Sequence, residues 1–184
     1  MTVNWTAGLV RWMPYSRRGT VFPLNHLHPF RYEVTIPASE KDPKRVVMVH
    51  VGFALHTFTR ERDSSTPSEE VYSDDRESRM FDDVRYELSK LLPEIIRSLG
   101  RRHCAFAKQD NYVTVEATMF SGETVNYGVF FNLKRWKERG PMAVLLVVQS
   151  AYVINVAKRS PAQGKITFRS LLLHALRGTK PRKP

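Results

Sequence analysis

The sequence contains few of the features that mark secreted, membrane-spanning or disulfide-bonded proteins. Its 184 residues include one cysteine, Cys104, which cannot form an internal disulfide and gives no thiol metal site by itself. The longest apolar run, MAVLLVV at 142–148, is much shorter than the roughly 18 residues that span a bilayer. The N-terminus lacks the residue order of a signal peptide. We therefore expect a cytoplasmic protein without a membrane partner, with Cys104 as a small buried residue.

The motifs of several large enzyme classes are also absent. The sequence has no glycine-rich phosphate loop, no CxxC pair, no HExxH and no GxSxG. His26 and His28 form an HxH pair, but no third ligand of matching spacing follows nearby. A nucleotide-dependent enzyme and a zinc enzyme are therefore disfavoured, and we expect neither a metal nor another cofactor.

Acidic residues are missing from the last part of the chain. The formal net charge is +11, and 10 of the 18 acids lie between Glu61 and Glu87. No acid follows Glu138, whereas nine lysines and arginines do. A basic C-terminal third favours approach to an acidic protein surface or weak binding of nucleic acid.

Hydrophobic patterning predicts one α+β domain over residues 1–184 with a mainly antiparallel sheet. The strands are expected in these segments: 31–38, 45–60, 103–120, 124–136 and 142–156. The remaining stretches are an irregular N-terminal segment (1–29), a mobile acidic loop (60–78) and a basic tail (178–184).

Two helices are expected to pack on this sheet. Apolar residues recur at helical spacing within 81–100 and predict one long helix over about 79–99, which Gly100 ends. Pro93 lies inside this helix and should kink it or split it into two pieces. The second helix is expected within 166–178, near the C-terminus.

One set of residues fits a ribonuclease. His50 and His56 lie in VHVGFALHTFT, where an even spacing on one strand would place both on the same face. Arg79 and Arg85 lie in or beside the expected long helix. Histidine can move the proton of a 2′-hydroxyl, and arginine can stabilise the charge that develops on the phosphate. The residue types fit this chemistry, although no spacing is diagnostic of it.

A second set lies in QGKITF at 163–168. Gln163, Ile166 and Phe168 resemble the peptide with which polymerases and repair proteins dock on the bacterial β sliding clamp. The glutamine amide would set the register, and the two apolar side chains would fill the groove. Lys165 and Arg169 would favour an acidic partner. The same residues also fit a strand that leads into an amphipathic helix, with Phe168 in the core.

The chain also resembles a family of bacterial proteins that are described only as uncharacterised or as stationary-phase growth proteins. The resemblance rests on VHVGFALHTFT, SRMFDDVRYELSKLLPEIIRSLG, NYGVFF and VVQSAYV, within about 28–156. With QGKITF added, it resembles the SocB-like toxins of toxin–antitoxin pairs. This resemblance implies a non-enzymatic inhibitor of DNA replication that occupies the sliding clamp. It also implies a cognate antitoxin that acts with a cytoplasmic protease. The alternative is a toxin ribonuclease that uses His50, His56, Arg79 and Arg85.

Overall fold

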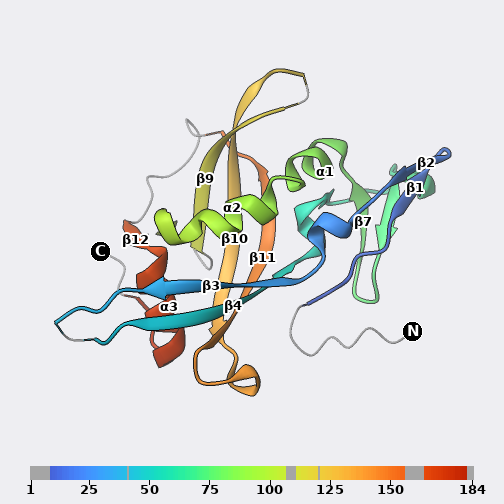
Figure 1. Ribbon diagram of the computed structural model, residues 1–184. Helices are drawn as coiled ribbons and strands as arrows, with labels where there is room; N and C mark the ends of the chain where they lie inside the picture. Colours follow the sequence, from blue (N-terminus) through green and yellow to red (C-terminus); the bar gives the residue numbers. More distant parts are fainter. Residues whose placement is uncertain (1–8, 41, 107–110, 120, 156–163, 182–184) are drawn as a thin grey trace.

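The computed structural model describes residues 9–40, 42–106, 111–119, 121–155 and 164–181 (Figure 1). Its largest element is a seven-stranded sheet with the strand order β12-β8-β9-β10-β11-β4-β3. The strands of this sheet are β3 (Phe30–Ile36), β4 (Arg45–Phe53), β8 (His103–Phe106), β9 (Asn111–Thr118), β10 (Thr124–Arg135), β11 (Ala143–Val153) and β12 (Lys165–Thr167). Only β4 and β11 pair in parallel among these described strands, so the expected mainly antiparallel sheet is confirmed.

Two smaller sheets lie beside the large one. A three-stranded sheet has the order β5-β7-β6, and β1 pairs with β2. Their strands are β1 (Tyr15–Arg17), β2 (Thr20–Phe22), β5 (Thr59–Arg60), β6 (Val71–Ser73) and β7 (Ser78–Phe81). Short 3₁₀ helices connect several strands: η1 (Asn25–Leu27), η2 (Leu55–Thr57), η3 (Ser68–Glu70), η4 (Leu99–Arg101) and η5 (Lys137–Arg139). The segments 1–29 and 60–78, predicted as irregular and as loop, thus contain ordered strands.

The helices α2 (Leu92–Ser98) and α3 (Phe168–Arg177) cover one face of the large sheet. Figure 1 shows α2 crossing in front of the strands, where the Tyr32 hydroxyl donates to the carbonyl of Ile96 at 2.8 Å. The α3 helix brings the ring of Phe168 to 6.1 Å from the ring of Phe131 in β10. The covered face therefore holds the core, and the opposite face of the same strands points away from both helices.

The long helix predicted over 79–99 is two helices. Residues 79–81 belong to β7, and α1 (Asp83–Ser89) ends before α2 begins at Leu92. The Asp82 side chain caps α1 by accepting from the Arg85 amide at 2.8 Å. Pro93 lies in the first turn of α2, where its missing N–H costs no helical hydrogen bond. The split that Pro93 predicted is confirmed, whereas the predicted start of the helix was wrong.

The single strand predicted over 45–60 was also wrong in its second half. The β4 strand ends at Phe53, and the chain then turns through η2 into β5. Two threonine hydroxyls bind backbone carbonyls in this turn, Thr57 to Ala54 at 2.8 Å and Thr59 to Leu55 at 2.7 Å. Such local side-chain bonds compete with strand pairing, and a β-branched composition does not reveal them.

Within the described residues, no helix is long and apolar enough to cross a membrane.

Candidate active site

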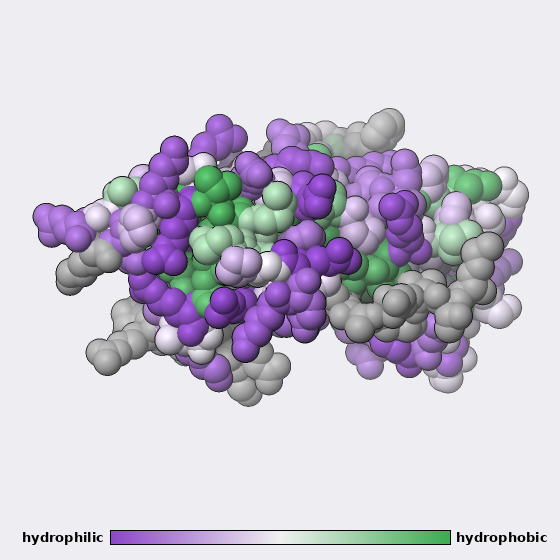
Figure 2. All heavy atoms as spheres, turned by 60° about the horizontal axis from the view of Figure 1, so that its bottom comes forward, coloured by the Kyte–Doolittle hydropathy of each residue, from purple (hydrophilic) through white to green (hydrophobic). Residues whose placement is uncertain are grey.

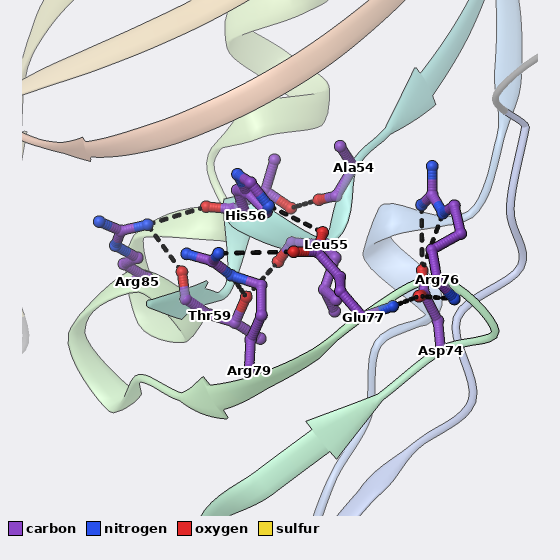
Figure 3. A network of polar contacts seen from close by, with 10 residues as sticks. Ala54, Leu55, His56, Thr59, Asp74, Arg76, Glu77, Arg79 and Arg85 are labelled. Carbon is purple, nitrogen blue, oxygen red and sulfur yellow. Dashed lines mark hydrogen bonds and ion pairs between the residues drawn. The ribbon is translucent and has the colours of Figure 1, made fainter. Parts of the chain in front are cut away.

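A network of polar side chains joins η2, β5, β7 and α1 at the end of the large sheet (Figure 3). It contains three of the four residues that the sequence singled out for ribonuclease chemistry: His56, Arg79 and Arg85. It adds Glu77 and Thr59, which the sequence analysis did not single out. The turn at η2 is what brings His56 to this place, because β4 stops at Phe53 instead of running on.

His56 and Glu77 form the exposed part of the network. Their side chains meet at 2.8 Å, between Nε2 of the imidazole and Oε1 of the carboxylate. The side chain of His56 is 41% exposed and that of Glu77 is 37% exposed, so solvent and a ligand can reach both. The Nδ1 atom of His56 forms no hydrogen bond with any residue that the structure describes. A carboxylate on one ring nitrogen fixes the imidazole and leaves the other nitrogen free for proton transfer.

Arg79 completes the chain of contacts. One of its terminal nitrogens lies 3.5 Å from Oε2 of Glu77, and its Nε donates to the Thr59 hydroxyl at 3.1 Å. The Thr59 hydroxyl in turn donates to the carbonyl of Leu55. Because the side chain of Arg79 is only 16% exposed, this packing holds the guanidinium in one orientation beside the His56–Glu77 pair.

Arg85 has a different role in the same network. One of its terminal nitrogens donates to the carbonyls of His56 and Thr59, at 3.1 and 2.7 Å. Its guanidinium also lies 5.2 Å from the ring centre of Tyr152. Burial lowers the pKa of Arg85, although Asp82 opposes this effect. Arg85 therefore holds the turn that carries His56, and we treat it as a positioning residue.

The turn before β7 places Glu77. The Asp74 carboxylate accepts from the amides of Arg76 and Glu77 at 2.8 and 3.0 Å and pairs with the Arg76 guanidinium. Burial raises the pKa of Asp74, but these hydrogen bonds outweigh burial and hold the pKa below its ordinary value. Asp74 is therefore a charged turn residue that fixes the backbone at Glu77.

The structure separates the other predicted histidine from this site. His50 lies in β4 and packs edge-to-face on Trp136, with ring centres 4.9 Å apart. Burial lowers the pKa of His50, and Arg139 and Arg31 lower it further. The expectation that His50 and His56 share one strand face was wrong, because His56 follows the end of that strand in η2.

The residues of the clamp-binding prediction lie at the far edge of the large sheet. Ile166 is half-buried in β12, where it pairs with Cys104 of β8, and Phe168 is fully buried at the start of α3. Lys165 and Arg169 are exposed, and Gln163 lies outside the described residues. In this conformation the segment is a strand that leads into a helix, and clamp binding would require Phe168 to leave the core.

The remaining candidate residues are His26, His28 and Cys104, and the structure gives each of them a structural role. His26 and His28 each use Nε2, on the Ser89 hydroxyl at 2.7 Å and on the carbonyl of Trp12 at 3.1 Å. Across the described ranges, no group of three histidine, cysteine or acidic side chains is placed to hold a metal ion. Cys104 is 1% exposed, and burial raises its pKa to about 12, so its expected role as a small buried residue is confirmed.

The sequence contained one overlooked sign of the site. Glu77 and Arg79 are two residues apart, and alternate residues of an extended chain share a face. Glu77 was assigned to the predicted loop (60–78) and Arg79 to the start of the predicted helix (79–99), so this spacing was not used.

Comparisons with known proteins identify a family for most of the chain but not its chemistry. The model of the YjaZ family matches residues 14–176, which include the candidate site and all but the last residue of α3. No curated protein and no solved structure matches the chain. The chain belongs to the YjaZ family.

Proposed function

We propose that this protein is a ribonuclease whose active site is the His56–Glu77–Arg79 network. The observation that carries the proposal is the continuous contact from an exposed imidazole through one carboxylate to a packed guanidinium. General base, orienting acid and phosphate-binding cation are the groups that RNA cleavage through the 2′-hydroxyl requires. Metal-free cleavage of this kind needs no cofactor.

Each residue has one role in the proposed reaction. Glu77 accepts from Nε2 of His56, so that Nδ1 takes the proton of the 2′-hydroxyl. The 2′-oxygen then bonds to phosphorus, and the bond from phosphorus to the 5′-oxygen breaks. Arg79 stabilises the added negative charge on the phosphate, and the departing 5′-oxygen takes a proton from water. The products are a 2′,3′-cyclic phosphate and a 5′-hydroxyl.

The test uses one RNA and its matched controls. The protein is incubated with a single-stranded RNA, with the same strand in DNA, and with RNA whose 2′-hydroxyls are methylated. Cleavage of the unmodified RNA alone, with cyclic-phosphate ends, is the expected result. Glu77→Gln should slow cleavage without stopping it, because a glutamine oxygen still accepts from the imidazole. Cleavage of the methylated RNA would contradict the mechanism, and intact RNA would contradict the function.

Such an enzyme fits a toxin of a toxin–antitoxin pair that acts in the cytoplasm. Uncontrolled RNA cleavage arrests growth, so a cognate antitoxin would have to cover the exposed His56–Glu77 pair or promote degradation of the toxin. Expression of the protein should arrest growth, and expression of His56→Ala should not. Equal arrest by the variant would separate the toxicity from this site.

Sliding-clamp inhibition is the second candidate, and the edge position of β12 favours it. Among the described strands this one pairs only with β8, through three residues, so it is held less firmly than a central strand. Clamp binding would require β12 and Phe168 to detach. The apparent affinity would then equal the affinity of the open state multiplied by the fraction of molecules in that state.

The clamp candidate has its own test, which leaves the core intact. Binding of the protein to purified bacterial sliding clamp is measured beside the Gln163→Ala variant, which changes neither Ile166 nor Phe168. Binding at micromolar or lower concentration that the variant loses would support clamp inhibition. The absence of binding by the folded wild-type protein would remove it.

A further inference from the structure

The face of the large sheet that points away from α2 and α3 carries a row of residues across four neighbouring strands. Arg31 in β3 lies opposite His50 in β4, and His50 lies beside Leu145 in β11. Leu145 in turn lies opposite Lys134 in β10. Directly paired residues project to the same side of a sheet, so all four share one face. Tyr32, the neighbour of Arg31, projects to the other side and contacts α2.

An aromatic side chain stands beside this row. Trp136 follows β10 and packs edge-to-face on His50, with ring centres 4.9 Å apart. The guanidinium of Arg139, in the following turn, lies 5.2 Å from the centre of the indole ring. Trp136 is half-buried, and Leu145 beneath the row is only 1% exposed. We call Arg31, His50, Lys134, Trp136 and Arg139 the basic–aromatic face.

The cations of this face lack acidic partners. No ion pair joins Arg31, Lys134 or Arg139 to an acid anywhere in the described part of the chain. By contrast, Arg17, Arg18 and Arg45 each have such a pair. Glu33, on the same side of β3 as Arg31, and Glu138 in η5 are exposed acids beside the face, and no ion pair joins either of them to a basic residue within the described ranges. The exposed positive charge is therefore available to an anionic ligand.

The short distance between the basic–aromatic face and the candidate active site limits the kinds of ligand that can contact both. His50 and His56 are six residues apart, so the two places are separated by at most about 20 Å of extended chain. A flexible anionic chain with flat bases can touch both.

Figure 2 shows a view of the molecule in which hydrophilic side chains surround a hydrophobic patch, in the half that contains the β3–β4 and β10–β11 hairpins.

We propose that the basic–aromatic face binds single-stranded RNA, with a base stacked on Trp136 and phosphates held by Arg31 and Arg139. The inference rests on the proposed ribonuclease, because it supplies the surface that holds the strand while His56 acts on it. Stacking on an aromatic ring requires unpaired bases, so a duplex is a poorer ligand than a single strand. Arginine beside an indole can hold a phosphate next to the stacked base.

Binding is measured separately from cleavage. A fluorescein-labelled RNA of twelve uridines is titrated with the His56→Ala protein, and fluorescence anisotropy gives the dissociation constant. Adding Trp136→Ala should weaken binding roughly 10-fold or more, because the stacked base loses its platform. Adding Trp136→Phe should restore binding to within about 3-fold, since phenylalanine keeps an aromatic face.

The charge contribution has a separate readout and a matched control. The Arg31→Ala/Arg139→Ala variant should lower the slope of log Kd against log salt by about 1.4, from two lost phosphate contacts. The control, Arg101→Ala/Lys180→Ala, removes two exposed cations elsewhere and should leave the slope unchanged. Circular dichroism confirms that each variant is folded.

Each outcome decides one claim. Unchanged affinity in Trp136→Ala and an unchanged slope in the arginine variant would overturn the inference, as would a duplex that binds as tightly as the single strand. If those binding results are obtained but the wild-type protein still cleaves RNA, the inference about the face is wrong and the proposed ribonuclease is retained. Face-dependent RNA binding without any cleavage by the wild-type protein would instead overturn the proposed enzyme.

Discussion

The sequence singled out candidate functional residues in both the His56 network and the β12–α3 segment. The fold leaves side chains of the first region exposed and buries the main anchor of the second. In the network, polar side chains from η2, β7 and α1 meet while His56 and Glu77 stay exposed. In the β12–α3 segment, the predicted anchor Phe168 is fully buried against the sheet. Side chains available to a ligand therefore lie at the first region, and those that stabilise the fold lie at the second.

This difference shows how one pattern serves two purposes. An aliphatic and an aromatic residue two positions apart fit a partner's groove, and they equally fit the end of a strand and the start of a helix. The Thr167 hydroxyl accepts from the Ser170 amide at 3.2 Å and caps α3. A capped amphipathic helix buries Phe168, which explains why this chain adopts the second arrangement.

The largest expected effect would test the buried role of Phe168. Phe168→Ala should lower the free energy of unfolding by about 3–5 kcal/mol, because it leaves a cavity beside Phe131. Urea denaturation measures the loss, and the neighbouring Arg169→Ala, which changes an exposed side chain, should stay within about 0.5 kcal/mol of the wild type. A loss below about 1 kcal/mol for Phe168→Ala would show that this side chain contributes little to the core and is available to bind a partner.

A smaller effect is expected from the residue that supports the His56 turn. Arg85→Lys keeps the charge but cannot reproduce both bonds to the carbonyls of His56 and Thr59. We expect the free energy of unfolding to fall by about 1.5–3 kcal/mol, the range for hydrogen bonds to charged groups. Arg62→Lys, at an exposed position, is the control. Equal stability of the two variants would show that Arg85 does not hold this turn.

The pH dependence should reflect His26, which lies outside both regions. Burial, helped by Lys90, lowers the pKa of His26 from 6.5 to about 4 in the folded protein. The unfolded chain binds this proton more readily, so stability is lost as the pH falls from about 6.5 to about 4, by at most about 1.4 kcal/mol per pH unit. Urea denaturation of His26→Asn should show a shallower loss over this window. Parallel curves for the variant and the wild type would contradict the assignment.

The smallest expected effect is that the Cys104 thiol of the native protein hardly reacts with a thiol reagent. Cys104 is buried beside β12, and its raised pKa leaves almost no thiolate at neutral pH. A thiol reagent such as dithionitrobenzoate should label the protein fully in denaturant and only very slowly in buffer. Rapid labelling of the native protein would mean that β12 detaches readily, which would strengthen the clamp candidate.

The sequence predicted the fold class and most strands because alternating apolar residues record which face is buried. The strands expected at 31–38 and 124–136 correspond closely to β3 and β10. The errors arose where local hydrogen bonds override composition. Threonine bonds ended β4 at Phe53, and a polar stretch concealed β6 and the turn at Asp74.

The site was predicted less completely than the fold. His56, Arg79 and Arg85 were selected for their chemistry and the structure brings them together, but the reason given for His56 was its presumed strand partner His50. Glu77 was missed because its spacing to Arg79 was not used, and because no residue pattern shows that this turn folds back on η2. Contacts between segments far apart in sequence depend on the tertiary fold, which local spacing does not encode.

The most direct test of the account is a cleavage time course with one single-stranded RNA and three proteins: the wild type, His56→Ala and the control His103→Ala. The account predicts that His56→Ala lowers the rate about 10²–10⁴-fold, the usual contribution of a general base. His103→Ala should keep the wild-type rate, because His103 is exposed in β8 and belongs neither to the network nor to the basic–aromatic face. Equal rates for the wild type and His56→Ala, or no cleavage by any of the three, would contradict the account.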